Sequence, residues 1–503
     1  MTPRTLIGQL AQHAQTRPAS LAVAVGTSGF TYGEFWERVL RAAGALREAG
    51  VEPGDRVVVA APREPEFLYA YFGCHLLRAI AVPHDPDIVP ARLQGIVDLL
   101  NARITLTSRR AALEAPPCAS LALTALTHGA ALPHADEFVD PQPEDPADVL
   151  LTSGTTGKAK GVILTHRNIL AAARNINQFI GNTAEDREAL ALPLSHSFGL
   201  ARVRCQVLAG GAVILAPGFQ FPKQVFEAMR SWRATGFSFV PAAWALLVRL
   251  AGERVAEFSP QLKYIEIGSA AMPRSEKERL MRLFPHTRIC MHYGLTEASR
   301  SAFIEFHQSK DRLDSVGRPT PNVEIEIVDE DGREVAPRQI GKIRISGAHV
   351  TAGYWGAAAG ERLRGAWLYT GDLGYRDEDG YLYLCGREDD VINIGGRKVH
   401  PAEIEQALLG HEQIADAVCV ATPDSLTGEA VRAFLVAKRG QTELPSAEAL
   451  ADFLRARLEQ YKIPVAFEWV GSIPRNASGK VERRTVAGLL GASRAPQDAG
   501  VRG

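Results

Sequence analysis

The chain has 503 residues, more than three times the roughly 150 residues of a typical domain, so we expect two or more domains. Hydrophobic residues make up 46% of the sequence and charged residues 22%, ordinary globular values that exclude wholesale disorder and a collagen-like repeat. The 56 basic and 57 acidic side chains leave a net charge of -1, which argues against nucleic acid or an anionic membrane as a partner bound through bulk charge.

Three features of the sequence bear on where the protein acts. No stretch approaches the ~18 uninterrupted apolar residues of a membrane-spanning helix, so we expect no membrane span. The N-terminus lacks the apolar core of a signal peptide, which disfavours export. The six cysteines are scattered and include no Cys-x-x-Cys pair, which favours reduced thiols over disulfides or a zinc cluster. These features favour a cytoplasmic location.

The N-terminal part of the chain is predicted to alternate between strands and helices. An apolar run at 21–25 predicts a strand, and Thr31 with Glu34 forms a Thr-x-x-Glu capping box that predicts the start of a helix. Gly50 marks the end of that helix, and Val57–Val59 follows as a buried strand after a Pro-Gly-Asp turn. Strands and helices that alternate with short turns are typical of parallel α/β sheets.

The hydrophobic pattern changes in the last third of the chain. Segments 323–328 and 341–345 alternate apolar and polar residues, which predicts antiparallel strands with one exposed face. Further on, a helix is expected to begin near Pro401, and apolar strands are expected at 417–420 and 431–436. The C-terminal part is therefore predicted to be a smaller α+β unit.

The strongest local signal is the segment 153–161, Ser-Gly-Thr-Thr-Gly-Lys-Ala-Lys-Gly, which lies between two apolar runs. Its three glycines let the backbone aim several N–H groups at one anion, and its three hydroxyls and two lysines add donors and positive charge. This composition predicts a polyphosphate-binding loop. The spacing does not fit Gly-x-x-x-x-Gly-Lys-Ser/Thr, which argues against a P-loop NTPase. Considered alone, the segment is also compatible with a Gly/Thr-rich surface loop.

Two shorter clusters carry groups that suit a nucleotide. Thr296 and Glu297 follow an apolar stretch; a threonine hydroxyl can donate to a phosphate oxygen, and a glutamate can hold the Mg²⁺ that accompanies ATP. Asp372 follows a Thr-Gly turn, where its carboxylate can bind a ribose diol. Each cluster has a plainer interpretation, because Thr-Glu pairs often begin helices and Gly-Asp pairs often form turns.

Taken together and in order, these segments resemble the acyl-adenylate-forming superfamily, which comprises acyl-CoA synthetases, nonribosomal-peptide adenylation domains and firefly luciferase. Two further segments carry the resemblance: residues 386–405 resemble the family's interdomain hinge and following loop, and Pro474–Lys480 resembles its catalytic-lysine loop. The resemblance extends from about Thr31 to Lys480, nearly the full chain.

The resemblance implies an α/β fold in two domains. Residues 1–388 would form an N-terminal adenylate-forming domain of β-sheets flanked by helices, which binds ATP and the acid. Residues 389–503 would form a small, mobile α+β domain that carries the catalytic lysine, with Asp389 at the hinge. The active site would lie between the two domains.

The resemblance also implies roles for individual residues. Lys480 matches the lysine that bridges the carboxylate and the α-phosphate, Thr296 would contact that phosphate, and Glu297 would hold Mg²⁺. Asp372 matches the ribose-binding carboxylate, and Arg387 matches a nearby contact to the nucleotide. The remaining positions implied to bind the nucleotide are Thr152, Ser153, Gly154, Thr155, Thr156, Gly157, Lys158, Lys160, Tyr293 and Gly294.

Positions for the acid and the thiol follow from the same resemblance. The implied acyl pocket comprises His196, Gly268, Ser269, Ala270 and His292. Many relatives have glycine in place of His292, whose side chain would shorten or polarise the tunnel and favour a small, medium or functionalised acid. No aspartate lies between residues 186 and 311, which disfavours an α-amino acid, but the span holds several glutamates that could take the place of the aspartate, Glu227, Glu266 and Glu305 among them. Gly395 and Gly396 match a segment that lines the thiol tunnel. The plainer interpretations are that the two histidines only pack and that the glycines only form a turn.

The reaction implied by the resemblance is the ATP- and Mg²⁺-dependent conversion of a carboxylic acid to an acyl-AMP, followed by transfer to the thiol of CoA. An acyl carrier protein is the alternative acceptor. From a different class, an ATPase or a nucleotide-binding module would use the same phosphate loop. An ATPase is distinguishable from the ligase by its products, because adenylation releases pyrophosphate and AMP whereas an ATPase releases ADP and phosphate. Assays with CoA and with holo-carrier protein distinguish the two acceptors.

Overall fold

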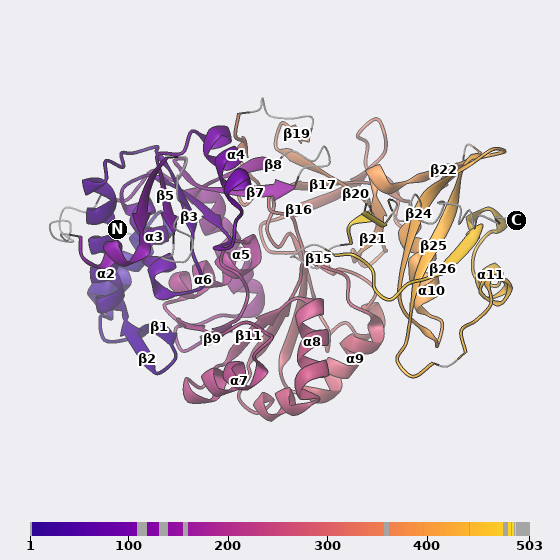
Figure 1. Cartoon of the computed structure of the whole chain (residues 1–503), viewed down its shortest axis with the longest axis horizontal. Coiled ribbons are helices and arrows are strands. Elements are labelled where there is room, and N and C mark those ends of the chain that lie inside the picture. The colour runs from indigo at the N-terminus through magenta and orange to yellow at the C-terminus, as the bar shows by residue number, and fades with distance from the viewer. Residues whose placement is uncertain are drawn as a thin grey trace, which may run out of the picture. The chain divides into compact units, whose positions relative to one another are not determined.

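The computed structural model describes most of the chain as helices and strands (Figure 1). The described residues are 3–107, 118–129, 139–153, 159–356, 362–395, 397–441, 443–475, 481–483, 485–486 and 488. The chain divides into two compact units: the first comprises Met1–Ser269, Arg274–Ile325 and Arg344–Tyr369, and the second comprises Ala270–Pro273, Glu326–Ile343 and Thr370–Gly503. The boundary between residues 388 and 389 remains a prediction.

The larger sheet of the first unit has nine strands among the described residues. In spatial order they are β15 (Arg318–Pro319), β14 (Ala302–Glu305), β13 (Arg288–Tyr293), β12 (Tyr264–Ile267), β11 (Gly236–Phe239), β9 (Arg187–Leu190), β10 (Ala212–Leu215), β1 (Leu21–Val25) and β2 (Ser28–Thr31). The strands from β13 to β1 are parallel to their neighbours, whereas β14, β15 and β2 pair antiparallel. The central strands β9 to β13 are apolar at most positions and buried, as expected when both faces of a parallel sheet are covered.

A second sheet in the first unit has seven strands among the described residues. Their order is β18 (Gly353–Tyr354), β8 (Ala159–Thr165), β7 (Pro146–Ser153), β4 (Ile80–His84), β3 (Arg56–Ala60), β5 (Ile104–Thr107) and β6 (Ala119–Ala122). Strands β3 to β7 are parallel to their neighbours, and β8 returns antiparallel to β7 as a hairpin. The predicted phosphate loop therefore joins the two strands of this hairpin.

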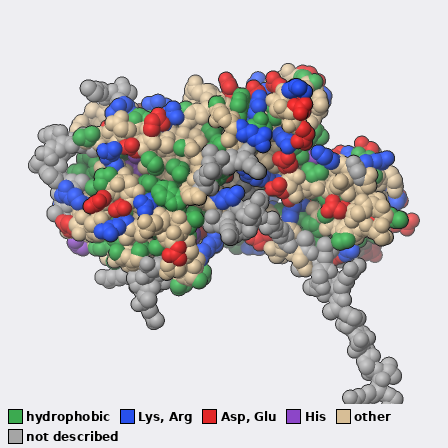
Figure 2. All heavy atoms as spheres, turned by 90° about the horizontal axis from the view of Figure 1, so that it is seen from above, with side chains coloured by type: hydrophobic (Ala, Val, Ile, Leu, Met, Phe, Trp, Pro, Cys, Tyr) green, Lys and Arg blue, Asp and Glu red, His purple; other side chains and the backbone are tan. Residues whose placement is uncertain are grey.

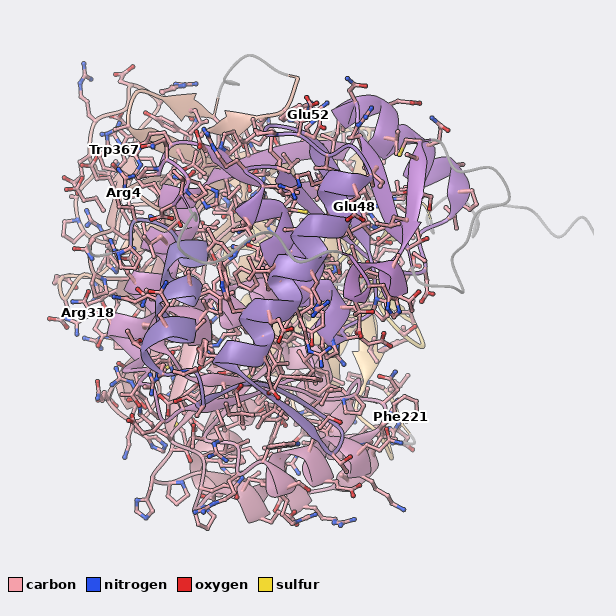
Figure 3. All side chains as sticks on the ribbon, turned by 90° about the vertical axis from the view of Figure 1, so that its left-hand side faces the viewer. Arg4, Glu48, Glu52, Phe221, Arg318 and Trp367 are labelled. Atoms are coloured by element: carbon pink, nitrogen blue, oxygen red, sulfur yellow. The ribbon has the colours of Figure 1, made fainter. Side chains whose placement is uncertain are left out.

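Helices connect the strands of the first unit. They are α1 (Leu6–Thr16), α2 (Tyr32–Glu48), α3 (Pro65–Leu76), α4 (Pro90–Leu100), α5 (His166–Ile180), α6 (Ser197–Ala209), α7 (Pro222–Ser231), α8 (Pro241–Ala251) and α9 (Arg274–Leu283). The capping box predicted at Thr31 and Glu34 is present at the start of α2. Figure 3 labels Glu48, the last residue of that helix, and Glu52 in the turn before β3. The prediction of an α/β fold is confirmed.

The C-terminal part of the second unit is an α+β fold, as predicted. Its sheet has the order β23 (Arg397–Val399), β22 (Ile392–Ile394), β25 (Gly428–Ala437) and β24 (Ile414–Asp424), with β26 (Ala466–Trp469) paired to β25. Helices α10 (Pro401–Leu409) and α11 (Ala447–Arg455) contribute Ile404, Leu408, Leu450 and Leu454 to its hydrophobic core. Pro401 occupies the first turn of α10, where the missing N–H has no intrahelical partner to lose.

A further sheet has the order β16 (Glu324–Val328), β17 (Gly341–Ser346), β20 (Trp367–Arg376) and β19 (Leu363–Arg364), with β21 (Leu382–Arg387) paired to β20. The alternating segments 323–328 and 341–345 are thus neighbouring strands.

Basic and acidic side chains are interspersed on the face drawn in Figure 2. No described helix is long and apolar enough to cross a membrane.

Candidate active site

The strands on either side of the phosphate loop are described, but the loop itself is not. Gly154, Thr155, Thr156, Gly157 and Lys158 lie outside the described residues, as do the side chains of Ser153 and Ala159. Thr152 pairs with Lys160 across the β7–β8 hairpin. The Lys160 ammonium lies 5.9 Å from the centre of the Tyr354 ring, a cation–π distance. The hairpin thus places a lysine at the exit of the loop.

Thr296 and Glu297 lie in a tight loop just after β13. Leu295 and Ala298 close this loop, since the N–H of each donates to the carbonyl of the other, at 3.0 and 3.2 Å. A side chain at Gly294 would meet the backbone N of Arg300 at 2.4 Å, so the turn requires glycine there. Tyr293, the last residue of β13, is buried, and Thr296 is half-buried. The structure therefore places these predicted residues at or just after the carboxyl end of β13.

Glu297 has the chemistry of a magnesium ligand. Its side chain is only 8% exposed and accepts a hydrogen bond of 3.0 Å from the hydroxyl of Tyr354. Among the described residues Glu297 forms no salt bridge, so no described cation neutralises this carboxylate. Mg²⁺ at nucleotide sites is bound by one or two carboxylates together with the phosphates. Glu297 therefore fits the role that the resemblance implies.

His292 and Gly268, both predicted for the acyl pocket, are in direct contact. A Cβ at Gly268 would lie 2.0 Å from Cε1 of His292, so the imidazole occupies the space that a side chain at 268 would need. The His292 side chain is 7% exposed, and its Nδ1 lies 2.8 Å from Oε1 of Glu266. Burial and the charge of Arg300 lower the pKa of His292 to about 4, so the ring is neutral at pH 7. The neighbouring Ser269 has a positive φ of 74°, an uncommon backbone conformation for serine.

A buried ionic network supports this region. Oε1 of Glu266 lies 3.0 Å from Nε of Arg300, and Oε2 lies 3.0 Å from Nη1 of Arg202. The other guanidinium nitrogen of Arg202 lies 2.8 Å from Glu188. Burial opposes ionisation of Glu266, but the two arginines hold the pKa of Glu266 well below its ordinary value. The carboxylates are thus compensated by guanidiniums, as buried charges must be.

His196 lies beside an aspartate from a distant part of the chain. Its Nε2 is 3.9 Å from Asp85, and the hydroxyl of Ser195 donates to the same carboxylate at 2.5 Å. The His196 and Asp85 side chains are 41% and 45% exposed. Asp85 directly follows β4 in the chain. The absence of aspartate between 186 and 311 therefore did not mean an absence of aspartate beside His196.

Sequence reasoning assigned no site role to four residues near the predicted ones: Asp85, Glu266, Arg300 and Tyr354. Two of them carried a signal. Glu266 is a charged residue within an apolar, buried strand, which points to a buried ionic partner. Asp85 follows the end of a parallel strand, where ligands bind in open α/β sheets.

In the second unit, Asp372 and Arg387 face each other across strands β20 and β21. Nη1 of Arg387 donates to Oδ1 of Asp372 at 2.7 Å and to the carbonyl of Thr370 at 3.2 Å. The N–H of Asp372 donates to Oγ1 of Thr370 at 3.0 Å, and the intervening Gly371 has a φ of 74°. The structure therefore joins two residues that the resemblance had assigned to the nucleotide separately.

The predicted hinge and thiol-tunnel residues also lie in the second unit. Asp389 is the middle residue of the 3₁₀ turn Glu388–Asp390 between β21 and β22. Gly395 forms the turn between β22 and β23 with a φ of 56°, a conformation that favours glycine. Gly396 and Lys480 lie outside the described residues. Ala270 belongs to the second unit, whereas Gly268 and Ser269 belong to the first.

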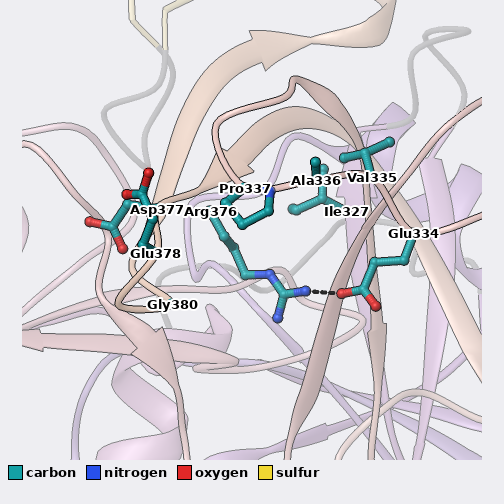
Figure 4. A pocket seen from close by; sticks show the side chains of 9 residues that line it. All are labelled: Ile327, Glu334, Val335, Ala336, Pro337, Arg376, Asp377, Glu378 and Gly380. Carbon is teal, nitrogen blue, oxygen red and sulfur yellow. Dashed lines mark hydrogen bonds and ion pairs between the residues drawn. The ribbon is translucent and has the colours of Figure 1, made fainter.

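A cavity of about 490 Å³ lies in the second unit (Figure 4). It is lined by Ile327 and by residues of segments 334–337 and 376–380, and an ion pair joins Arg376 to Glu334 at its edge. None of the predicted site residues lines it. The cavity therefore adds nothing to the candidate active site.

Comparison with known protein families matches both parts of the chain. Residues 10–355 match the model of the AMP-binding enzyme family. Residues 403–480 match the model of the AMP-binding enzyme C-terminal domain. The two matches follow each other in the order that the sequence motifs predict.

Two similar proteins are named as ligases of fatty acids. The chain is 31% identical to the fatty acid–[acyl-carrier-protein] ligase ScoC of Streptomyces coeruleorubidus, over 96% of this chain and 95% of that protein. It is also 31% identical to the long-chain-fatty-acid–CoA ligase of Bacillus subtilis, over 96% of this chain and 94% of that protein. These two relatives differ in the thiol named as acceptor.

Solved structures with bound nucleotide have the same fold. ATP-bound MatB from Rhodopseudomonas palustris superposes with a TM-score of 0.88 at 25% identity, over 97% of this chain and 99% of that one. The O-succinylbenzoate coenzyme A synthetase of Bacillus subtilis, in complex with ATP and a magnesium ion, gives a TM-score of 0.83 at 28% identity, over 95% and 99% of the two chains.

Proposed function

Because this chain belongs to the AMP-binding enzyme family, we propose that it is an AMP-forming acid–thiol ligase. In the first half-reaction a carboxylate attacks the α-phosphate of ATP, which gives an acyl-AMP and releases pyrophosphate. In the second, the thiol of CoA attacks the acyl carbonyl, and AMP leaves. The observation that carries the proposal is the ordered match of both family models to one chain.

The proposed site residues answer the main difficulty of the first step, which is that both reactants are anions. Lys480 would bridge the attacking carboxylate and the α-phosphate, and Thr296 would donate to that phosphate. Glu297 would hold Mg²⁺, which neutralises phosphate charge when bound. Asp372, which is already paired with Arg387, would present its carboxylate to the ribose. Preorganised charges of this kind usually contribute more to catalysis than any other single effect.

We propose that the two half-reactions use two arrangements of the domains, related by rotation about Asp389. Rotation would withdraw Lys480 and bring Gly395 and Gly396 to the thiol. Lys480→Ala should then cripple the formation of acyl-AMP but spare the formation of thioester from supplied acyl-AMP. Equal loss of both half-reactions would contradict the two arrangements.

For the acid, the contact between His292 and Gly268 supports a short or polar pocket. The neutral imidazole fills space beside the glycine and is joined to a buried glutamate. A small, medium or functionalised acid should therefore be converted with a higher kcat/KM than a long saturated one. Faster conversion of a long-chain fatty acid than of short or aromatic acids would overturn this assignment.

A carrier protein is the second candidate acceptor, because one similar protein is an acyl-carrier-protein ligase. Parallel assays with CoA and with a phosphopantetheinylated carrier protein, each after formation of the acyl-AMP, separate the two.

We also propose a cytoplasmic location. All six cysteines are free thiols, and reduced thiols persist in the cytoplasm.

The experiment that tests the function is the exchange of labelled pyrophosphate into ATP across a panel of carboxylic acids. We expect exchange that depends on both the acid and Mg²⁺. Release of ADP and phosphate instead, with no exchange for any acid, would indicate an ATPase and overturn the proposal.

A further inference from the structure

Glu297 is a buried carboxylate whose described side-chain partner is a neutral hydroxyl. The Glu297 and Tyr354 side chains are 8% and 9% exposed, and the hydroxyl of Tyr354 donates to Oε1 of Glu297 at 3.0 Å. A buried carboxylate is costly unless a cation or several donors compensate it. One phenol orients the carboxylate without neutralising it, which leaves its charge available to a bound cation.

Tyr354 is itself held against the strand that leaves the phosphate loop. It pairs with Val162 of β8, and the adjacent Gly353 pairs with Ile163. The next residue, Trp355, donates its N–H to the carbonyl of Gly161 at 2.7 Å. Backbone hydrogen bonds to β8 therefore hold the main chain of Tyr354 in place.

The segment 350–354 also holds the backbone of Glu297. The N–H of Thr351 donates to the carbonyl of Glu297 at 2.7 Å, and Val350 forms a β-bridge with Ala298. The hydroxyl of Thr351 donates to the carbonyl of Ile163 at 2.5 Å. One short segment thus links β8 to the loop of Glu297.

The start of helix α5 fixes the same segment from a third side. The amide of Asn168 donates to the carbonyls of Ala348 and Val350 at 2.9 and 2.7 Å.

We propose that Tyr354 is a positioning residue for the cation of the nucleotide: its hydroxyl holds one oxygen of Glu297 so that the other is directed at the metal. The segment 350–354 would keep a fixed spacing between the exit of the phosphate loop and this carboxylate. The inference rests on the proposed function, which assigns Mg²⁺ to Glu297. An outer hydrogen bond of this kind typically contributes about 10- to 100-fold to metal affinity.

The test is Tyr354→Phe, which removes one oxygen and keeps the ring. Binding of Mn²⁺ in the presence of α,β-methylene-ATP, which cannot be adenylated, is measured from the loss of the free Mn²⁺ signal in electron paramagnetic resonance. We expect the Kd for Mn²⁺ to rise about 10-fold or more. The affinity for the ATP analogue without metal, measured in EDTA by calorimetry, should change less than twofold.

Two variants serve as controls. Glu297→Gln removes the carboxylate itself and should weaken Mn²⁺ binding at least as much as Tyr354→Phe does. Tyr32→Phe removes another buried hydroxyl of the first unit, which donates to the carbonyl of Gly211 at 2.8 Å. It should affect the thermal midpoint as Tyr354→Phe does but leave Mn²⁺ binding unchanged. A merely structural role for Tyr354 would make the two tyrosine variants indistinguishable.

Unchanged Mn²⁺ affinity in a folded Tyr354→Phe chain would overturn the inference, whatever the exchange assay shows. Absence of pyrophosphate exchange in the wild type would overturn the function instead, so the two failures are distinct. If Tyr354→Phe does not fold, 4-aminophenylalanine and O-methyltyrosine at position 354 replace it. Only the first can donate, so it should bind Mn²⁺ more tightly than the second; equal binding would again overturn the inference.

Discussion

Two buried glutamates of the first unit, Glu266 and Glu297, differ in how their charge is compensated. Glu266 lies within 3.0 Å of two guanidiniums, those of Arg300 and Arg202. Glu297 accepts a hydrogen bond from a neutral phenol and forms no salt bridge with any described residue. A carboxylate that is already paired serves the fold, whereas an oriented but unneutralised one is suited to a bound cation. The same residue type therefore has two uses within one unit.

The largest expected effect tests the paired glutamate. Glu266→Gln would leave the buried guanidiniums of Arg300 and Arg202 without their shared carboxylate. Removing one partner of a buried ion pair costs about 3–5 kcal/mol. Urea unfolding of the purified chain measures the loss. A change below about 1 kcal/mol would show that Glu266 is not the structural glutamate of the pair.

The next effect tests the other glutamate. Glu297→Gln should lower the acid-dependent pyrophosphate exchange about 10²- to 10³-fold, the cost of losing one preorganised electrostatic group. The free energy of unfolding should stay equal or rise, because a buried charge without a described cation is removed. If Glu297→Gln unfolds as easily as Glu266→Gln, the comparison between the two carboxylates fails.

A smaller effect concerns pH. Since burial and Arg300 lower the pKa of His292 from 6.5 to about 4, the native state keeps this ring neutral while the unfolded chain takes up a proton below pH 6.5. Stability is then fully present above pH 6.5 and is lost as the pH falls toward 4. Between pH 7.5 and pH 5 this residue alone should cost about 2 kcal/mol. His292→Gln should reduce the pH dependence of urea unfolding by that amount; an unaltered pH dependence would contradict the buried neutral ring.

The smallest effect on stability is expected at the half-exposed pair of Asp85 and His196. Asp85→Asn should change the free energy of unfolding by less than about 0.5 kcal/mol, because solvent screens both groups. If His196 faces the acid, as the family resemblance implies, the same change should raise the KM for the acid. An unchanged KM, or a clear loss of stability, would show that Asp85 serves the fold, as Glu266 does, and not the binding of the acid.

Much of the fold could be predicted because its signals are local. The Thr31 and Glu34 capping box, the strand at Val57–Val59 and the helix beginning at Pro401 each depend on neighbouring residues, and all are present in the structure. The motif residues Thr296 and Glu297 were found because they lie next to each other. The partner of Glu297 was not, because Tyr354 lies 57 positions further along the chain.

The acyl-pocket histidine shows the same limit. From the sequence, His292 indicated a shorter or more polar tunnel, and Gly268 was assigned to the same pocket without any predicted contact between the two residues. Their direct contact depends on the parallel pairing of β12 and β13, which brings Gly268, the residue after β12, next to His292 of β13. The pattern of residues within one strand does not show which other strand it will pair with.

The order of the motifs by itself determined the family, the α/β architecture and the expected chemistry, because the predicted polyphosphate loop, the Thr-Glu pair and the Gly-Asp turn each consist of adjacent residues. Only the tertiary structure decided which charges are paired and which are not. Distant segments meet through strand pairing and helix packing, and it is those contacts that give Glu266 its two arginines, His196 its aspartate and Glu297 its tyrosine.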